Sequence, residues 1–287
     1  MNLSIITPSF NMLAHLKRAV SSIADQNPDK KFDLEHIIID GGSTDGTVEW
    51  LSGKPQWRTV SEPDSGMYDA LNKGLVLASG DILGYLNCDE QYLPGTLAFV
   101  CDYFNEHPDV DMLFGDVLLT RPDGSLVAFR KGYKPRLPYL LTSHLYVLTC
   151  TMFFRRQIID NGVIFDPTLR AAGDLDFVVR VLQHGYTVAH VKRYLSAFTV
   201  TGKNLSVNPR AIAERHQLLN AAPGYIRLLK WPLNMVRLTE KFLSGAYFQQ
   251  SPLAYAVYVD DMNHEEDIPR TRQLFSVDRP SFKWRFE

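Results

Sequence analysis

Acidic and amide side chains stand at three points where a ligand site would form. Asp40 ends a strongly β-branched run, Asn87-Cys88-Asp89-Glu90 follows the apolar run 82–86, and Asp174 heads a predicted helix. Ligands of open α/β sheets bind at the carboxyl ends of the strands. Two oxygen ligands at positions i and i+2, as Asn87 and Asp89 are, can hold a hard divalent cation against a diphosphate. The pattern predicts a nucleotide site with a cation.

Each of these acids also fits a structural role when it is taken alone. The acids of 87–90 could cap the following helix, and Asp40 could form a turn at the end of its strand. Asp174 is favoured at a helix start by capping and by the helix dipole. The residues by themselves leave both interpretations open. The histidines are better explained as structural residues, because they show no metal-ligand spacing: His144, His184 and His190.

The segment 61–90, SEPDSGMYDALNKGLVLASGDILGYLNCDE, supplies the elements that would position the central site. Its apolar residues recur at i, i+3, i+4 and i+7 over 67–78, which predicts an amphipathic helix. Asp69, Asn72 and Lys73 share the polar face of that helix, so we expect them to face a ligand. The short apolar run 81–86 predicts a buried strand.

The chain before this segment alternates strands with helices. Residues 3–7 and 35–40 predict buried strands, and a helix with Leu13, Leu16, Ala19, Val20 and Ile23 on its inner face lies between them. The loop 41–47 leads into another helix, for which Ser43 or Thr44 is a plausible N-cap. Such alternation indicates βαβ units and a mainly parallel sheet. The dinucleotide fingerprint GxGxxG is absent, which counts against an oxidoreductase.

From residue 111 the pattern changes. The runs 112–119 and 126–129 predict a hairpin across the turn Arg121-Pro122-Asp123-Gly124. A strand over 150–154, a helix after Asp174, and short strands over 188–190 and 194–200 follow. Helices are predicted over 209–221 and 225–243, and the last forty residues are unassigned. We expect a catalytic domain over 1–205, with halves 1–110 and 111–205, and a helical C-terminal extension over 206–287.

Composition limits the classes of partner and the cellular compartment that the sequence predicts. The 287 residues carry a net charge of -2 with no long basic run, which argues against nucleic acid as a partner. Three widely spaced cysteines, Cys88, Cys101 and Cys150, argue for a reducing compartment, and the start MNLSIITPSF lacks the basic region of a signal peptide. We therefore expect a cytoplasmic protein. The uncharged stretches 137–154 and 242–259 are too polar or too interrupted for transmembrane helices.

Four motifs resemble those of family 2 glycosyltransferases in order and spacing. They are Thr7-Pro8-Ser9-Phe10-Asn11, Asp40-Gly41-Gly42-Ser43-Thr44-Asp45-Gly46-Thr47, the run 62–74 (EPDSGMYDALNKG) and Leu86-Asn87-Cys88-Asp89. The chain is similar to bacterial members that build surface polysaccharides, over roughly residues 1–205. The resemblance implies a GT-A fold, which has a Rossmann-like, mainly parallel sheet flanked by helices and a small antiparallel part. It also implies a nucleotide-sugar donor, a divalent cation (Mn²⁺ or Mg²⁺) and inversion at the anomeric carbon.

The resemblance also assigns roles to particular residues. Thr7, Pro8 and Phe10 would line the base, Asp40 would hydrogen-bond it, and Gly41, Gly42 and Ser43 would let the backbone approach the nucleotide. Asp64, Asn72 and Lys73 would border the ribose and diphosphate, with Asn87 and Cys88 also at the donor. Asp89 would be the metal ligand and Asp174 the general base, and the loop 201–206 resembles one that folds over the donor. The sequence departs from the family pattern at three places. Asn87 replaces the first acid of D-x-D, Glu90 stands where many relatives have Asp, and Cys150-Thr151 replace a His-Gln pair.

The resulting hypothesis is an inverting hexosyltransferase that moves a sugar from a UDP-sugar to a glycan or lipid-linked acceptor. A sugar nucleotidyltransferase and a degenerate, non-catalytic nucleotide-sugar-binding protein are the alternatives. Basic residues alternate with apolar ones over 225–243. Such a segment can lie on an anionic membrane surface, or pack on the catalytic domain or on a second subunit of a homo-oligomer. The sequence slightly favours packing of this segment on the catalytic domain or on a second subunit over contact with a membrane.

Overall fold

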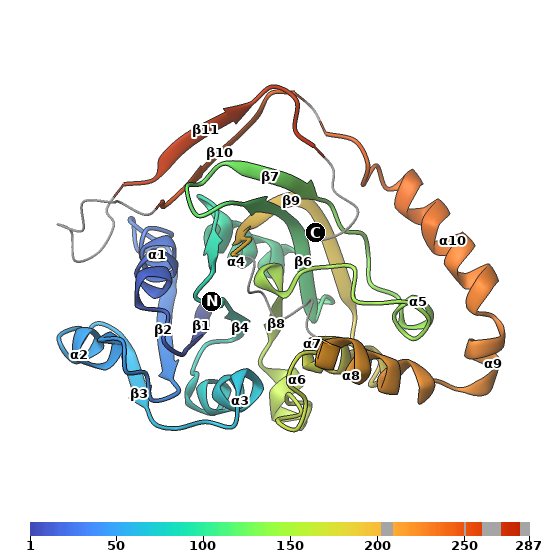
Figure 1. Cartoon of the computed structure of the whole chain (residues 1–287), viewed down its shortest axis with the longest axis horizontal. Helices are drawn as coiled ribbons and strands as arrows, with labels where there is room; N and C mark the ends of the chain where they lie inside the picture. Colours follow the sequence, from blue (N-terminus) through green and yellow to red (C-terminus); the bar gives the residue numbers. More distant parts are fainter. Residues whose placement is uncertain (202–208, 250, 260–270, 282–287) are drawn as a thin grey trace.

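The computed structural model describes residues 1–201, 209–249, 251–259 and 271–281. In that part of the chain, nine strands form one curled sheet in the order β3-β2-β1-β4-β8-β6-β9-β5, with β7 paired to β6 (Figure 1). Its strands are β1 (Asn2–Ser9), β2 (Asp33–Asp40), β3 (Arg58–Ser61), β4 (Ile82–Tyr85), β5 (Glu90–Tyr92), β6 (Met112–Thr120), β7 (Leu126–Arg130), β8 (Phe153–Arg155) and β9 (Val188–Thr199).

The first half of the sheet is parallel, as the alternation of strands and helices predicts. β3, β2, β1 and β4 all run in one direction. The short strand β3 was not predicted, because its residues are mostly exposed and show no apolar run. The chain order turns back between β1 and β4, which makes their carboxyl ends the switch point where α/β folds bind ligands.

The second half of the sheet is mixed. The β6–β7 hairpin is confirmed, and β8 runs antiparallel to both β4 and β6. β9 is one long strand beside β6 where two short strands were predicted, and its pairing register shifts near Asp116. The predicted strand over 150–154 is instead a 3-10 turn, η1 (Thr149–Thr151), followed by β8. The turn brings residue 149 toward the site described below.

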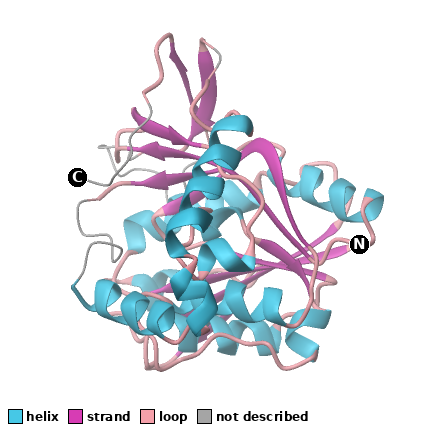
Figure 2. Ribbon diagram, turned by 90° about the vertical axis from the view of Figure 1, so that its right-hand side faces the viewer, coloured by secondary structure: helices cyan, strands magenta, loops and turns pink. Residues whose placement is uncertain are grey.

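Helices cover both faces of the sheet (Figure 2). One core lies under α3 (Met67–Leu77), α6 (Gln157–Asp160) and α7 (Gly173–Gln183), and another lies under α1 (Leu13–Ala24) and α4 (Thr96–Glu106). The shorter helices are α2 (Thr47–Ser52) and α5 (Leu137–Leu140). The prediction of Ser43 or Thr44 as the N-cap of α2 is wrong. Gly46 occupies that position, and the Asp45 carboxylate accepts a hydrogen bond from the backbone N–H of Thr47.

The C-terminal part contains α8 (Pro209–Asn220), α9 (Gly224–Leu228), α10 (Lys230–Leu243) and a two-stranded sheet, β10 (Leu253–Val257) with β11 (Gln273–Val277). The helices were predicted and the two strands were not. Leu253, Tyr255 and Val257 pack on Leu118 and Phe129 of the main sheet. The extension is therefore not wholly helical, and its strands share a core with the catalytic sheet. The domain division at residue 205 stays a prediction.

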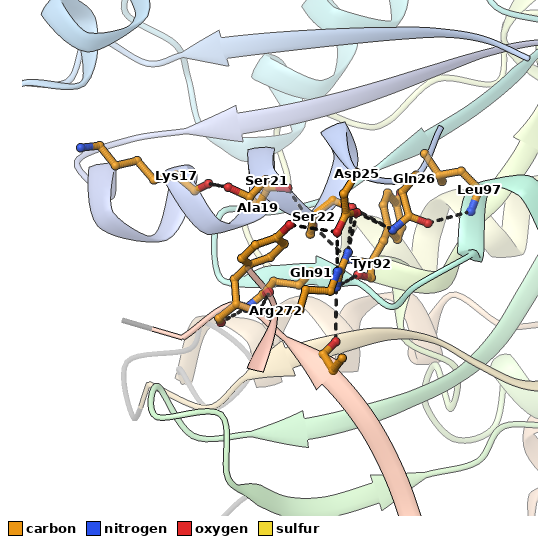
Figure 3. Close-up of polar contacts among 12 residues, drawn as sticks. Lys17, Ala19, Ser21, Ser22, Asp25, Gln26, Gln91, Tyr92, Leu97 and Arg272 are labelled. Carbon is orange, nitrogen blue, oxygen red and sulfur yellow. Dashed lines mark hydrogen bonds and ion pairs between the residues drawn. The ribbon is translucent and has the colours of Figure 1, made fainter. Parts of the chain in front are cut away.

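Arg272, just before β11, ties this added sheet to the helix layer (Figure 3). Its guanidinium donates to the Asp25 carboxylate at the end of α1, to the carbonyl of Ser22 and to the carbonyl of Tyr92. Gln91 of β5 exchanges two hydrogen bonds with the backbone of Tyr258. No helix among the described residues is long and apolar enough to cross a membrane.

Candidate active site

A pocket of about 1320 Å³ lies at the carboxyl ends of β1 and β4, the edge that the topology selects. It extends toward α8 and α10, which contribute Arg215, Arg237 and Lys241 to its wall. Half of the residues assigned from the sequence line it: Pro8, Phe10, Asp64, Asn87, Cys88, Asp89 and Asp174. The pocket thus brings together the end of the first strand, the segment after β4 and the start of α7.

Asp174 is held in the pocket by hydrogen bonds from three elements. Its Oδ1 accepts from the Tyr85 hydroxyl at the end of β4 (2.7 Å), and its Oδ2 accepts from the Thr149 hydroxyl of η1 (3.3 Å). The backbone N–H of Asp174 donates to the Tyr68 hydroxyl of α3 (3.3 Å). Asp174 lies in the first turn of α7, where the helix dipole also favours a negative charge.

The protonation chemistry of Asp174 suits a base. Burial raises the pKa of this carboxyl above its usual value, and the hydrogen bonds from Tyr85 and Thr149 partly oppose that shift. A raised pKa makes the carboxylate a stronger proton acceptor, and catalysis is most efficient when the pKa of the base approaches the working pH. The arrangement can therefore take a proton from a hydroxyl bound in the pocket.

The turn after β4 presents oxygen atoms to the same pocket. Glu90 is buried, and its Oε2 accepts a hydrogen bond from the backbone N–H of Asn87 (2.8 Å). Burial and then the neighbouring Asp89 raise the pKa of Glu90 well above its usual range. Glu90 thus fixes the turn that presents Asn87 and Asp89.

The same turn offers donors that fit a divalent cation. The side-chain oxygen of Asn87 is buried and has no hydrogen-bond partner. A buried amide oxygen without a partner is costly, and a cation would satisfy it. An amide oxygen and the Asp89 carboxylate are ligands that Mg²⁺ and Mn²⁺ accept. No three His, Cys, Asp or Glu side chains cluster as a metal site among the described residues, so the remaining ligands would have to come from substrate or water.

The end of the pocket beside β1 is lined by Pro8, Phe10 and Asp64. The Phe10 ring is 60% exposed at its rim, which is unusual for a large aromatic side chain and suits stacking on a base. Asp64 accepts a hydrogen bond from the backbone N–H of Gly66 (2.7 Å). A Cβ atom at Gly41 would lie 2.6 Å from the Asp64 carboxylate, so a larger residue there would push that side chain aside.

Asp40 and its loop shape this end without lining it. The Asp40 carboxylate is fully buried and accepts hydrogen bonds from the backbone N–H groups of Gly42 and Ser43 and from the Ser61 hydroxyl. Thr7 is likewise buried, with its hydroxyl 2.9 Å from the Nε2 atom of His36. These contacts hold the loop after β2. The predicted contact of Asp40 with a base stays a prediction.

Asn72 and Lys73, which were expected to border the diphosphate, do not line the pocket. The Asn72 side chain exchanges two hydrogen bonds with the backbone of Phe165. Lys73 pairs with Glu62 at 2.8 Å and with Asp69 at 3.7 Å. Both side chains serve the packing of α3 in this structure.

Several residues in or directly behind the pocket wall were missed by the sequence analysis. Tyr85 and Thr149 donate hydrogen bonds to the Asp174 carboxylate, and Arg237 and Lys241 of α10 line the pocket. Tyr85 lies in the predicted strand 81–86, directly before the central motif, so the sequence could have identified it as a site residue. Thr149 and the basic residues could not be found, because their elements are distant in sequence. The predicted donor-covering loop, 201–206, lies outside the described residues except for residue 201.

Comparison of the sequence with known proteins points to glycosyltransferases. The family model described as "Glycosyl transferase family 2" matches residues 4–162. A "PGL/p-HBAD biosynthesis glycosyltransferase" of Mycobacterium bovis is 28% identical over 88% of this chain and 96% of its own length. An "Uncharacterized glycosyltransferase" of Mycobacterium tuberculosis is 32% identical over 73% of this chain and 79% of its own.

Solved structures agree on the fold. TarS of S. aureus in complex with UDP superposes with a TM-score of 0.61 at 21% identity, over 85% of this chain and 72% of that one. The mannosyltransferase PcManGT of Pyrobaculum calidifontis, in complex with GDP-Man and Mn²⁺, gives a TM-score of 0.53 at 17% identity, over 85% and 80% of the two chains. Sequence and fold lead to the same assignment, which removes the nucleotidyltransferase alternative. The chain belongs to glycosyl transferase family 2 and is a glycosyltransferase with a GT-A fold.

Proposed function

We propose that this enzyme transfers a sugar, with inversion, from a UDP-sugar to a hydroxyl group of a glycan or lipid-linked acceptor. One observation carries the proposal: two carboxylates with different surroundings line one pocket. Asp174 is held by hydroxyl groups and has a raised pKa, while Asp89 lies next to a buried amide oxygen without a partner. Different environments suit a base and a cation ligand respectively.

The reaction is a single displacement. The Asp174 carboxylate takes the proton of the acceptor hydroxyl while the oxygen of that hydroxyl attacks the anomeric carbon. The bond from that carbon to the diphosphate oxygen breaks, and the nucleoside diphosphate leaves with the bonding electron pair. Attack from the face opposite the leaving group inverts the anomeric carbon.

The donor lies between the two ends of the pocket in this proposal. Pro8 and Phe10 would contact the base, Asp64 would border the ribose, and Asn87 and Asp89 would hold Mn²⁺ or Mg²⁺. A bound cation neutralises charge on the departing diphosphate. The choice of UDP is supported by the structural similarity to TarS, solved with UDP and with UDP-GlcNAc. PcManGT, solved with GDP-Man, makes GDP the competing choice.

A donor screen tests the function. Melting temperatures are measured with UDP- and GDP-sugars, each with Mn²⁺, Mg²⁺ or a chelator, because a ligand that binds the native state raises its melting temperature. The proposal predicts cation-dependent stabilisation by one or more UDP-sugars, and slow release of UDP that the chelator stops. Binding without any turnover would support the non-catalytic alternative, and indifference to chelator would remove the cation.

Asp89→Asn separates cation binding from chemistry. The substitution removes one negative charge from the cation site, so we expect donor affinity in Mn²⁺ to fall about 10-fold or more, by analogy with charge-assisted contacts worth about 1.5–3 kcal/mol. Affinity in chelator should stay unchanged. Calorimetric titration of UDP in the two conditions measures both. Equal losses in both conditions would contradict the assignment of Asp89 as a cation ligand.

We also propose that the outer face of α10 contacts a membrane surface. Trp231, Met235, Phe242 and Leu243 are 52–79% exposed on that face, while Arg237 of the same helix is buried. The helix therefore turns its apolar side outward, at the edge of the molecule in Figure 1. Arg227 in the preceding helix α9 and Lys230 at the start of α10 both have exposed side chains. Apolar and aromatic residues beside cations favour an anionic bilayer surface, whereas two copies docking through this face would bring their cations together.

Flotation with vesicles tests the membrane contact. Wild-type protein should float with vesicles of anionic lipid and much less with neutral lipid. The double variant Trp231→Ser/Phe242→Ser should stay at the bottom, and Val76→Ser, which removes an 83% exposed side chain from α3, should float as the wild type does. A variant that floats unchanged, or a wild type that forms a dimer lost in the variant, would overturn the membrane contact.

A further inference from the structure

Positive charge gathers at the end of the pocket that the donor does not fill. Arg130 at the end of β7, Arg215 of α8, and Arg237 and Lys241 of α10 all line it. We call these four residues the basic end. Figure 1 shows α10 and α5 on the opposite side of the molecule from β1 and β2, where the base is proposed to lie.

Arg237 is the centre of this group and is poorly compensated by the protein. Only 8% of it is exposed. Its guanidinium donates to the Asn234 side-chain oxygen (3.1 Å) and to the Tyr133 hydroxyl (3.2 Å), which are both neutral. The carboxylate of Glu240, one turn away, is bonded to Arg136 (2.9 Å) and to Tyr139 (2.9 Å). Among the described residues, no carboxylate forms an ion pair with Arg237. A buried charge without a counter-charge is costly.

The titration of neighbouring groups reports the same excess of positive charge. Burial first, and then Arg237 and Arg130, lower the pKa of Lys241 to about 8. Burial, followed by Arg237, Arg215, Lys241 and Arg130, lowers the pKa of His144 to about 4. Four cationic side chains thus share this end of the pocket, and an anion bound there would be attracted to them.

We infer that the basic end binds a phosphate group carried by the acceptor. Guanidinium groups match the oxygens of phosphate, and several cations fit its double negative charge. The segment 144–149 runs along the pocket wall from His144 to Thr149, whose hydroxyl bonds Asp174. A phosphate at the basic end would thus lie on the acceptor side of the base. That the phosphate belongs to an acceptor rests on the proposed function. That the basic end binds a phosphate does not.

Two kinds of acceptor carry such a group. A lipid-linked acceptor has a diphosphate next to its first sugar, and a phosphodiester glycan has a phosphate in each repeat. Both present the same chemistry to Arg237 and Lys241. The two acceptors differ in what is attached to the phosphate, a lipid chain in one and a glycan repeat in the other, so separate probes can distinguish them.

Phosphate binding is tested with the donor site filled. Inorganic phosphate, farnesyl diphosphate and glycerophosphodiester are titrated into protein saturated with UDP and Mn²⁺, and binding is followed by calorimetry. We expect saturable binding of inorganic phosphate and tighter binding of one organic probe, which identifies the source. Arg237→Gln and Lys241→Met should each weaken phosphate binding about 10- to 100-fold. Lys230→Met removes a cation of α10 that does not line the pocket, and should leave phosphate binding unchanged.

The outcomes separate the inference from the proposed function. UDP binding serves as the folding control, because it should be unchanged in all three variants; if Arg237→Gln fails to fold, Lys241→Met carries the test. No binding of phosphate, binding that UDP abolishes, or equal binding by Lys241→Met and Lys230→Met would overturn the inference. A protein that binds phosphate as described but no nucleotide sugar would overturn the proposed function and leave the phosphate site in place.

Discussion

Asp174 is the residue on which the proposed chemistry depends. It combines a raised pKa with hydrogen bonds that fix its orientation. The substitution Asp174→Asn keeps the size of the side chain and removes its basicity. We expect the transfer rate to fall about 10²- to 10⁴-fold, as for other general bases. Donor affinity in calorimetry should stay within twofold, because the base contacts the acceptor. Transfer left intact, or donor binding lost with it, would refute the assignment.

Tyr85 tunes the pKa of that base. Its hydroxyl donates to the Asp174 carboxylate, and a hydrogen bond to the ionised form lowers the pKa. Tyr85→Phe should raise the pKa of Asp174 further, so the base becomes active only at higher pH. The acid limb of the pH–rate profile should move up by about one to two units, the equivalent of a hydrogen bond to a charged group. Tyr103→Phe on α4, outside the pocket, is the control. An acid limb that moves to lower pH, or that does not move, would show that Tyr85 does not lower the pKa of Asp174.

Site residues could be predicted where a short motif carries them. Asp89 and Asp174 follow recognisable motifs, and both line the pocket. Asp40 and Asn72 also lie in motifs, yet their side chains bond the protein itself. A motif fixes which residues stand near a site, but not the direction in which each side chain points. Arg237 has no motif at all, because its place in the pocket depends on how α10 packs.

Among the elements, α8 positions the start of α7. The buried carboxylate of Glu214 accepts hydrogen bonds from the backbone N–H groups of Arg170, Ala171 and Ala172, directly before Asp174. Glu214→Ala leaves those groups without this acceptor. Because misplacement of a catalytic group by about 1 Å can cost about 100-fold, we expect kcat to fall by 10- to 100-fold with unchanged donor affinity.

Two variants check that Glu214 acts by position. Glu214→Gln keeps an oxygen acceptor and should recover part of the activity. Glu106→Ala, an exposed residue of α4, should have no effect. Equal activity of Glu214→Ala and wild type would show that α8 does not position the base.

Arg272 is one polar clamp that holds the β10–β11 sheet against the rest of the protein. The Arg272 side chain is 9% exposed and pairs with Asp25. Arg272→Met leaves the carbonyl groups of Ser22 and Tyr92 and the Asp25 carboxylate without this donor. We expect the free energy of unfolding to fall by about 2–4 kcal/mol in urea denaturation. Lys31→Met breaks an exposed pair with Asp29 and should cost about 0–1 kcal/mol. Similar losses in both variants would show that the clamp adds nothing.

Regular elements were predictable where the apolar period is strong. The buried strands β1, β2 and β6 and the helices α1, α3 and α7 are such cases. The strands β3 and β11 were missed because most of their residues are exposed or half-buried. The strand β10 buries Leu253, Tyr255 and Val257, but it is only five residues long and lies in the segment left unassigned. Their pairing comes from tertiary contacts rather than from local pattern.

At the scale of the whole molecule, one pocket joins carboxylates of the parallel half to a group of cations on the other side. Carboxylates of the parallel half stand at the proposed donor, and the basic end comes from β7, α8 and α10. The face of α10 that we propose to contact a membrane lies on the same helix as the basic end. Donor binding, chemistry and acceptor recognition are thus proposed for separate elements that meet in one pocket.

The stereochemistry of the sugar that leaves the donor tests the central claim most directly. Early in the reaction, proton NMR can report the anomeric configuration of the product, or of the free sugar when water is the acceptor. A single displacement with Asp174 as base predicts that an α-linked UDP-sugar gives a β product first. A first product of α configuration would contradict the account.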